Sequence, residues 1–446
     1  MSVIQFKDTY GAWDATEDAL ASKLVSYHPN IRYCQTWGKW LIWDEQVWKH
    51  DETIAVFDLI RRFCRSQSEL VTKNDGDLRK ICSAVTVAAI ERLCKSDRAY
   101  AAVPDQFDRD DWSLNTPGGL VNLKDGTICE QSPDAYCMKI TAVEPEGECP
   151  RWTEFLGEVT NHDAELIAFL QRMAGYCLTG STMEHALFFL YGSGGNGKSV
   201  FIDTLSGVMK DYAQNSPMET FTESHTDRHP TELAKLQGSR LVFAQETEQG
   251  RKWAQAKIKA LTGGDKISAR FMRQDYFEYK PKFKLVIAGN TKPKLDHVDE
   301  AMRRRFHVVP FTVQIPAENR DRELSEKLRR EYSGILAWAV EGCLQYQAQG
   351  LNPPSAVTEA TANYLEAQDV FGEWLATECE TGPEHWEPSS LLFNSWKNYA
   401  EAARERVGRQ AEFRERMENA GFHKARDYAR GHYWQGIRAI PKEAKW

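Results

Sequence analysis

The residue pattern with the clearest chemical meaning is a glycine-rich segment in the middle of the chain. An apolar stretch, 186–191, is expected to form a strand before it, and 200–209 a helix after it. In such a loop, backbone N–H groups and the helix N-terminus bind phosphates. Lys198 would reach the β- and γ-phosphates of ATP, and Ser199 would hold Mg²⁺. The alternative is a glycine-rich structural turn. The pattern G-x-x-x-x-G-K-[ST] is carried by Gly192, Ser193, Gly194, Gly195, Asn196, Gly197, Lys198 and Ser199.

A second pattern places acidic residues directly after an apolar strand, 240–244. In NTP-hydrolysing enzymes, a carboxylate at the carboxyl end of a core strand holds the metal shell and polarises the attacking water. We expect Glu246 in this role, with Glu248 as the alternative. The predicted metal ligands are therefore Ser199 and Glu246. Solvated acids at a strand end are the competing interpretation.

A third apolar strand, 283–289, ends in Asn290, whose amide can hydrogen-bond both the γ-phosphate and the attacking water. An Asn at a strand end is often only a turn residue, but third in this series it predicts a sensor of the nucleotide. Arg303, Arg304 and Arg305 then precede another strand, 307–311. They suggest an arginine finger, which requires an oligomer if a neighbouring subunit supplies it. A salt-bridged surface cluster is the alternative.

Between the second and third strands, residues 267–279 are expected to form a hairpin that turns near 272–275. Basic residues near or on it would contact DNA phosphates and not bases. A solvated hairpin without DNA contact fits the pattern equally well. The candidate residues are Lys266, Arg270 and Arg273.

These elements lie in a zone of alternating short strands and amphipathic helices, which is typical of an α/β domain. We expect three domains: an α+β domain over 1–180, the α/β domain over 181–350, and a helical, basic tail over 351–446. In the first, 37–43 and 47–48 predict a hairpin. The first domain should close with a helix capped by Asn161 or Asp163.

Composition limits the class of protein. The chain has 446 residues, 42% of them hydrophobic, and a net charge of −8, so DNA contact has to come from local basic features or from a ring that gathers them. No apolar run is long enough to span a membrane, and no secretory signal is expected. The ten cysteines form no Cys-x-x-Cys pair, which argues against zinc and for reduced thiols in the cytoplasm.

The tail contains expected helices over 370–378 and 410–419, and a third that Ser389 or Ser390 can cap. Residues 432–434 and 436–438 are expected to pair as a short hairpin. From 401 to 446 the chain has 11 Lys and Arg against 7 Asp and Glu. DNA contact by basic residues here is as plausible as a solvated helix face. The candidates are Arg414, Lys424, Arg426 and Arg430.

The order of these motifs resembles a superfamily III helicase, and within it the phage and plasmid primase-helicase family, which is related to the poxvirus primase-helicase. The likeness includes the segment 259–265 and, outside the helicase motifs, the segments 114–120, 123–126, 150–152, 155–156 and 233–238. The resemblance implies a P-loop NTPase of modified AAA+ type, a homohexameric ring and a winged-helix-like C-terminal domain. It assigns Lys198, Ser199, Glu246 and Asn290 to the nucleotide site and Arg305 to the finger, although adjacent Arg304 leaves that assignment open. Met272 and Arg273 would lie near the hairpin tip. Gln245 stands where related helicases can carry a second acid.

The resulting expectation is an ATP-dependent DNA helicase of viral, phage or plasmid replication that moves on single-stranded DNA and acts on forked duplex DNA. It would lie in the cytoplasm, of a bacterial host if phage or plasmid encoded. The segment before residue 30 is too short for a primase, so we expect a separate primase or polymerase as partner. An origin-binding initiator or loader that assembles with ATP but does not unwind DNA is the alternative. A GTPase is disfavoured because the chain has no Asn-Lys pair.

Overall fold

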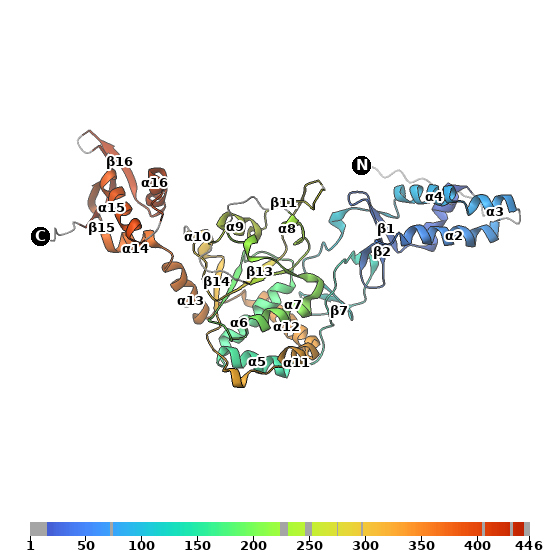
Figure 1. Cartoon of the computed structure of the whole chain (residues 1–446), viewed down its shortest axis with the longest axis horizontal. Helices are drawn as coiled ribbons and strands as arrows, with labels where there is room; N and C mark the ends of the chain where they lie inside the picture. Colours follow the sequence, from blue (N-terminus) through green and yellow to red (C-terminus); the bar gives the residue numbers. More distant parts are fainter. Residues whose placement is uncertain are drawn as a thin grey trace.

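The computed structural model arranges the chain in three parts that follow one another along the long axis of the molecule (Figure 1). An N-terminal part of helices and small sheets leads into a central α/β part, and α13 connects this to a C-terminal part. No helix among the described residues is long and apolar enough to cross a membrane. The structure describes residues 16–71, 75–223, 231–245, 252–273, 275–295, 298–403, 406–428 and 431–440, without the side chains of 69–71.

The N-terminal part combines helices α1 to α4 with a four-stranded sheet of order β3-β2-β1-β4. The predicted hairpin is confirmed, because β2 and β3 pair antiparallel with Trp43 opposite Trp48. Apolar faces of α1, α2 and α4 pack on this sheet through Leu24, Ile60 and Ile90, all fully buried. The elements are α1 (Glu17–Tyr27), β1 (Ile31–Cys34), β2 (Lys39–Trp43), β3 (Trp48–His50), α2 (Ala55–Val71), α3 (Asp75–Ile81), α4 (Ala84–Ser96) and β4 (Ala101–Ala102).

A second small sheet, β5-β6-β7, and two helices connect this part to the central one. Asp163 caps α6, as predicted, by accepting from the backbone N–H groups of Glu165 and Leu166. Trp152 of α5 and Phe169 of α6 share one buried core with Phe188 and Phe201 of the central part. The central core therefore continues upstream of residue 180. The elements are η1 (Pro104–Gln106), β5 (Ser113–Thr116), β6 (Gly119–Asn122), β7 (Ile128–Cys129), η2 (Pro133–Ala135), α5 (Pro150–Thr160) and α6 (Ala164–Leu178).

The central part is built on a parallel sheet of order β14-β8-β13-β10-β9, which confirms the predicted α/β class. Successive side chains of β8 enter two cores on opposite faces, Phe188 and Leu190 on one and Leu187 and Phe189 on the other. Such two-sided burial explains why these strands are continuous apolar runs. The strands are β8 (Leu187–Tyr191), β9 (Ala213–Asn215), β10 (Leu241–Gln245), β13 (Lys284–Gly289) and β14 (Phe306–Pro310).

Helices cover both faces of this sheet, and a hairpin projects between β10 and β13 (Figure 1). The predicted hairpin is confirmed, since β11 and β12 pair antiparallel from Ile267 with Tyr279 to Ala269 with Phe277. The remaining elements of the central part are α7 (Lys198–Met209), η3 (Lys210–Tyr212), η4 (Met218–Thr220), α8 (Thr231–Ala234), α9 (Gln255–Gly263), β11 (Ile267–Ala269), β12 (Phe277–Tyr279), α10 (Glu300–Arg303), η5 (Ala317–Asn319), α11 (Leu324–Arg330) and α12 (Tyr332–Gln349).

The C-terminal part packs three helices on an antiparallel sheet of order β15-β17-β16. Its core is aromatic, with Trp374, Trp396 and Trp434 almost fully buried. The predicted helices over 370–378 and 410–419 are confirmed. The elements are α14 (Val370–Glu378), β15 (Cys379–Pro388), α15 (Ser389–Ala402), α16 (Gln410–Asn419), β16 (His423–Asp427) and β17 (Gly431–Ala439), and the connecting helix α13 (Ser355–Glu366) precedes them.

Two predictions in this part are wrong. Residues 432–434 and 436–438 do not pair with each other, because both belong to β17, whose hairpin partner is β16. Gly436 lies opposite an irregularity in β15 between Thr381 and Trp386, so this glycine accommodates a β-bulge and not a turn. The expected serine cap of α15 is also wrong, since Pro388 occupies the N-cap position and makes no side-chain cap.

Candidate nucleotide and nucleic-acid sites

The glycine-rich segment forms the connection between β8 and α7. Gly194, Gly195 and Gly197 have positive φ, at 101°, 66° and 84°, conformations that residues with a Cβ rarely adopt. A Cβ on Gly192 would lie 2.0 Å from the carbonyl oxygen of Phe311, so only glycine fits there. The loop is therefore closed tightly and ends at the N-terminus of a helix, where unpaired backbone N–H groups favour an anion.

Lys198 folds back into this loop from the first residue of α7. Its ammonium donates to the carbonyl oxygen of Gly192 at 2.7 Å, to Oδ1 of Asn196 at 2.8 Å and to Oδ1 of Asn290 at 3.2 Å. The side chain is 6% exposed, and this burial lowers the pKa of Lys198 below its usual value. Its three oxygen partners are all neutral, so the charge of the ammonium is not compensated within the described part of the chain.

Asn290 is the residue that follows β13, and β13 pairs with β8 so that Gly289 lies opposite Tyr191. Because parallel strands end at the same edge of a sheet, the glycine-rich loop and Asn290 meet there. The Asn290 side chain is exposed apart from its contact with Lys198. The structure thus brings Lys198 and Asn290, which the sequence predicted to share a site, into hydrogen-bond contact.

The predicted metal ligands are described only in part. Ser199 is exposed on the first turn of α7, and its hydroxyl has no hydrogen-bond partner in the described chain, so it fits an oxygen ligand of Mg²⁺. Glu246 and Glu248 lie outside the described residues. The residue before Glu246, Gln245, pairs with Ala288, so β10 ends at the same edge as β13. Among the described residues no cluster of His, Cys, Asp and Glu could hold a metal ion.

Arg305 lies at the opposite end of the sheet from the glycine-rich loop. Its carbonyl accepts from the N–H of Leu187, the first residue of β8, whereas the loop follows the last residue of that strand. The four residue steps of β8 alone separate the two ends by roughly 13 Å. The guanidinium is buried at 6% exposure and donates to Oγ1 of Thr262 at 3.2 Å and to the carbonyl of Ala301 at 2.7 Å. The side chain of Arg304, by contrast, is exposed.

The hairpin between β11 and β12 presents basic and apolar side chains to solvent. Met272 is 70% exposed, and Lys266 and Arg273 are also exposed. Arg270 lies over the ring of Tyr276, at 4.6 Å from its centroid. Tyr276 is itself 60% exposed, and it was not among the predicted DNA contacts. The sequence signal that could have identified Tyr276 was its position directly after the predicted turn, 272–275, within the predicted hairpin.

The predicted DNA contacts of the C-terminal part differ in whether they form an ion pair within the chain. Arg414 pairs with Glu418 at 2.7 Å along α16. Lys424 and Arg426 are exposed on β16 and have no carboxylate partner in the described residues. Arg430 lies outside the described residues. Of the predicted DNA contacts here, the structure leaves Lys424 and Arg426 unpaired.

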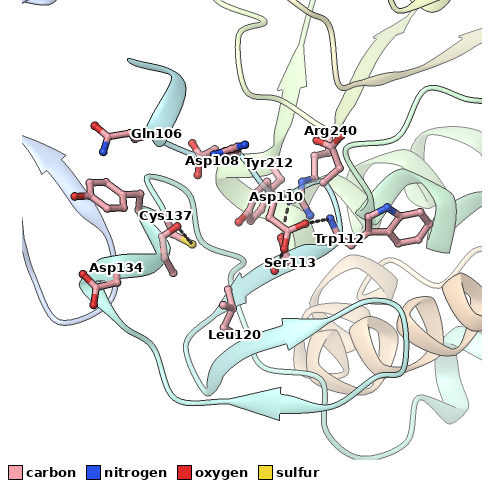
Figure 2. A pocket seen from close by; sticks show the side chains of 14 residues that line it. Gln106, Asp108, Asp110, Trp112, Ser113, Leu120, Asp134, Cys137, Tyr212 and Arg240 are labelled. Carbon is pink, nitrogen blue, oxygen red and sulfur yellow. Dashed lines mark hydrogen bonds between the residues drawn. The ribbon is translucent and has the colours of Figure 1, made fainter. Parts of the chain in front are cut away.

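A cavity of about 750 Å³ lies away from these residues, between the segment 106–137 and the amino end of β10 (Figure 2). The guanidinium of Arg240 lies at its wall, 4.7 Å from the ring centroid of Tyr212, and donates to the carbonyl oxygens of Leu178, Asp110 and Ser113. The guanidinium N–H groups of Arg240 thus connect the segment before the central part to the parallel sheet. Burial also raises the pKa of Asp108 above its usual value. No sequence motif predicted this cavity, whose lining includes no residue of the glycine-rich loop.

The fold and the loop together define an α/β protein in which a glycine-rich connection, a buried lysine and an asparagine meet at the carboxyl edge of a parallel sheet. Two family models match the chain: one described as D5 N terminal like, over residues 21–161, and one described as a family of unknown function, over 190–305.

Three curated relatives match part of the chain. A protein of Acanthamoeba polyphaga mimivirus named "putative helicase" is 25% identical over 60% of the chain, and one of the same name from Frog virus 3 (isolate Goorha) is 26% identical over 52%. Primase D5 of Fowlpox virus (strain NVSL) is 23% identical over 61%. The family-model match and the names of these relatives support the resemblance to the primase-helicase family. The matched regions make up 30%, 26% and 35% of these relatives, so the chain spans about a third of their length or less.

A solved structure supports the fold. The apo structure of the C-terminal region of NrS-1 superposes with a TM-score of 0.52 at 12% identity, covering 95% of this chain and 100% of that one. At this identity the likeness concerns the arrangement of elements alone.

Proposed function

We propose that the chain is an ATP-driven DNA helicase of viral, phage or plasmid replication, with a P-loop NTPase domain of modified AAA+ type. The observation that carries this proposal is the Lys198 ammonium. It is buried in a glycine-rich loop next to Asn290, and within the described part of the chain it is bonded only to neutral oxygens. Keeping an uncompensated cation buried costs free energy, and the phosphates of a nucleotide would supply the missing negative charge.

In this proposal each residue has one role at the nucleotide. Backbone N–H groups of the loop and the N-terminus of α7 hold the phosphates of ATP. Lys198 exchanges its neutral partners for β- and γ-phosphate oxygens. Glu246 polarises the attacking water, and Asn290 orients that water and the γ-phosphate. Mg²⁺, held by Ser199 and Glu246, would neutralise charge on the phosphates.

The arginine that stabilises the transition state comes from a neighbouring subunit. Arg304 and Arg305 lie at the far end of the sheet from the loop of their own chain, so neither can reach its own nucleotide. A homohexameric ring satisfies this geometry if the sheet edge of one subunit that carries Arg304 and Arg305 faces the glycine-rich loop of the next subunit. Arg305 is the finger implied by the family resemblance, but it is buried and bonded within its chain, whereas Arg304 is exposed.

The DNA contacts belong to two surfaces. Lys266, Arg270, Met272 and Arg273 on the hairpin would grip the backbone of single-stranded DNA in the ring, where hydrolysis moves the hairpin. The C-terminal part, with three helices on an antiparallel sheet, would act as a winged-helix-like module that contacts forked duplex DNA through Arg426 and Arg430. A separate primase or polymerase would act on the exposed strand.

Strand separation on a forked duplex tests this proposal. Wild-type protein with ATP should release the labelled strand, and Lys198→Ala protein, which lacks the ammonium, should not. ATP-dependent assembly on DNA without strand release would favour an initiator or loader. If the protein neither assembles on DNA nor releases the strand, both proposed functions are contradicted.

A further inference from the structure

We propose that Arg320 is an additional nucleotide-binding residue, whose guanidinium contacts the phosphate chain of the nucleotide held by the glycine-rich loop of its own chain. The inference rests on the proposed function, because it assigns a further contact in the same site. Arg320 follows η5, more than a hundred residues after the loop, and no sequence motif selects it.

The segment after β14 is bonded to the glycine-rich loop at two positions. Nδ2 of Asn196 donates to the carbonyl oxygen of Phe311 at 2.6 Å, and the N–H of Ile315 donates to the carbonyl oxygen of Gly195 at 3.0 Å. Arg320 then returns to this segment, since its Nε donates to the carbonyl oxygen of Ile315 at 3.0 Å. The arginine is thereby fixed to the same backbone that fixes the loop.

The guanidinium of Arg320 lies directly over Gly195. A Cβ at position 195 would lie 2.4 Å from Nη2 and 3.2 Å from Cζ of Arg320, so the absence of a side chain on Gly195 is what lets the arginine approach. Lys198 occupies the inside of the loop, bonded to the carbonyl oxygen of Gly192. The loop therefore has one cation bonded within it and a second packed against Gly195.

The charge of Arg320 has no carboxylate partner in the described part of the chain. The adjacent acid, Asp321, accepts instead from Nζ of Lys327 at 2.8 Å and from the backbone N–H of Glu323 at 2.9 Å. The side chain of Arg320 is exposed, and only its Nε is used in a hydrogen bond. A planar guanidinium with both terminal nitrogens free is suited to phosphate oxygens, which it can bind through two parallel hydrogen bonds.

Affinity for ATP and for ADP tests this inference, measured by titration calorimetry on wild type, Arg320→Ala, Arg320→Lys and Arg322→Ala. Arg322 is an exposed arginine two residues away that has no hydrogen bond or ion pair with the loop among the described residues, so it is the matched control. We expect Arg320→Ala to weaken both nucleotides roughly tenfold or more, the size of a charge-assisted hydrogen bond. Arg320→Lys should recover part of the loss, and Arg322→Ala should bind like wild type.

The outcomes separate this inference from the proposed function. If wild type binds ATP and Arg320→Ala binds it equally well, the assignment of Arg320 is wrong while the nucleotide site stands. An equal loss in Arg322→Ala would also overturn the assignment, because it would indicate a general charge effect. If wild type binds neither nucleotide, the proposed function itself fails.

Discussion

The ammonium of Lys198 lies 3.2 Å from Oδ1 of Asn290, so the first residue of α7 is bonded to the residue that follows β13. These residues are far apart in sequence but meet because β8 and β13 are neighbours in the parallel sheet. The contact links the group proposed to bind phosphate to the group proposed to orient water. A nucleotide that recruits Lys198 would therefore free Asn290 for its own role.

Substitution of Asn290 should separate hydrolysis from binding. We expect Asn290→Ala to lower kcat for ATP about 100-fold, the effect of losing one preorganised polar group at a reaction centre, while ATP affinity changes only a few-fold. Steady-state ATPase assays and nucleotide titrations measure the two quantities. Asn215, exposed at the end of β9 on the same sheet edge, is the control, and Asn215→Ala should match wild type. A normal kcat in Asn290→Ala would remove it from the mechanism.

Arg304 and Arg305 should fail in different ways. In assembled protein, we expect Arg304→Ala to lower kcat by about 10³-fold, as loss of a finger does, without changing thermal stability. Arg305→Ala should lower the free energy of unfolding by about 1–3 kcal/mol, because it removes buried hydrogen bonds to Thr262 and Ala301. ATPase assays and thermal unfolding distinguish the two effects.

Mixing subunits tests whether the finger acts between chains. Neither Arg304→Ala nor Lys198→Ala protein alone should hydrolyse ATP, but a mixture should regain part of the activity. Activity returns because the intact glycine-rich loop of an Arg304→Ala subunit can then face the intact Arg304 of a Lys198→Ala subunit. A mixture that stays inactive, although the subunits are shown to assemble together, would argue against an arginine supplied in trans.

The hairpin should account for part of the affinity for single-stranded DNA. Arg273→Ala should weaken binding and reduce the slope of log affinity against log salt by about 0.7, the value for one phosphate contact on a single strand. Arg92, exposed on α4, provides the control, and Arg92→Ala should leave both quantities unchanged. An unaltered slope in Arg273→Ala would show that this arginine does not contact a phosphate.

Stability should depend on pH through His307 of β14, whose ring stacks on Phe188 at 5.4 Å. Burial lowers the pKa of His307 from 6.5 to about 4, so between these values the unfolded chain binds the proton and the folded chain does not. Neutral His307 therefore makes its full contribution to the free energy of unfolding above pH 6.5. As the pH falls towards 4, this free energy decreases by up to about 3 kcal/mol.

Urea unfolding of His307→Phe measures this effect. The variant keeps an aromatic ring at the site but has no group to titrate, so its free energy of unfolding should fall less over that pH range. His423→Phe, at an exposed position, should keep the wild-type dependence. Identical pH dependence in wild type and His307→Phe would contradict the assignment.

The sequence predicted what depends on local chemistry. The glycine-rich motif is contiguous and flanked by β8 and α7, and buried parallel strands are apolar along their whole length, so the sequence predicted both the loop and the strands. Asp163 was identified as a cap because its own side chain bonds the next turn. Asn290 could be placed beside the loop because parallel strands end at one edge.

What the sequence did not predict depends on distant partners. The run through Gly436 looks like a turn until β15 is known to pair with it, and β15 itself contains Gly382 and Pro383, which usually interrupt a strand. The burial of Arg305 follows from Thr262 on α9, and the position of Arg320 follows from the backbone of Gly195. None of these contacts leaves a pattern in nearby residues.

ATP hydrolysis with and without single-stranded DNA, compared between wild type and Lys198→Ala, tests the central claim most directly. A DNA-coupled motor predicts that wild type hydrolyses ATP, that single-stranded DNA raises the rate, and that Lys198→Ala abolishes both. Wild-type hydrolysis that does not respond to DNA, or hydrolysis that persists in Lys198→Ala, would contradict the claim that this site drives movement on DNA.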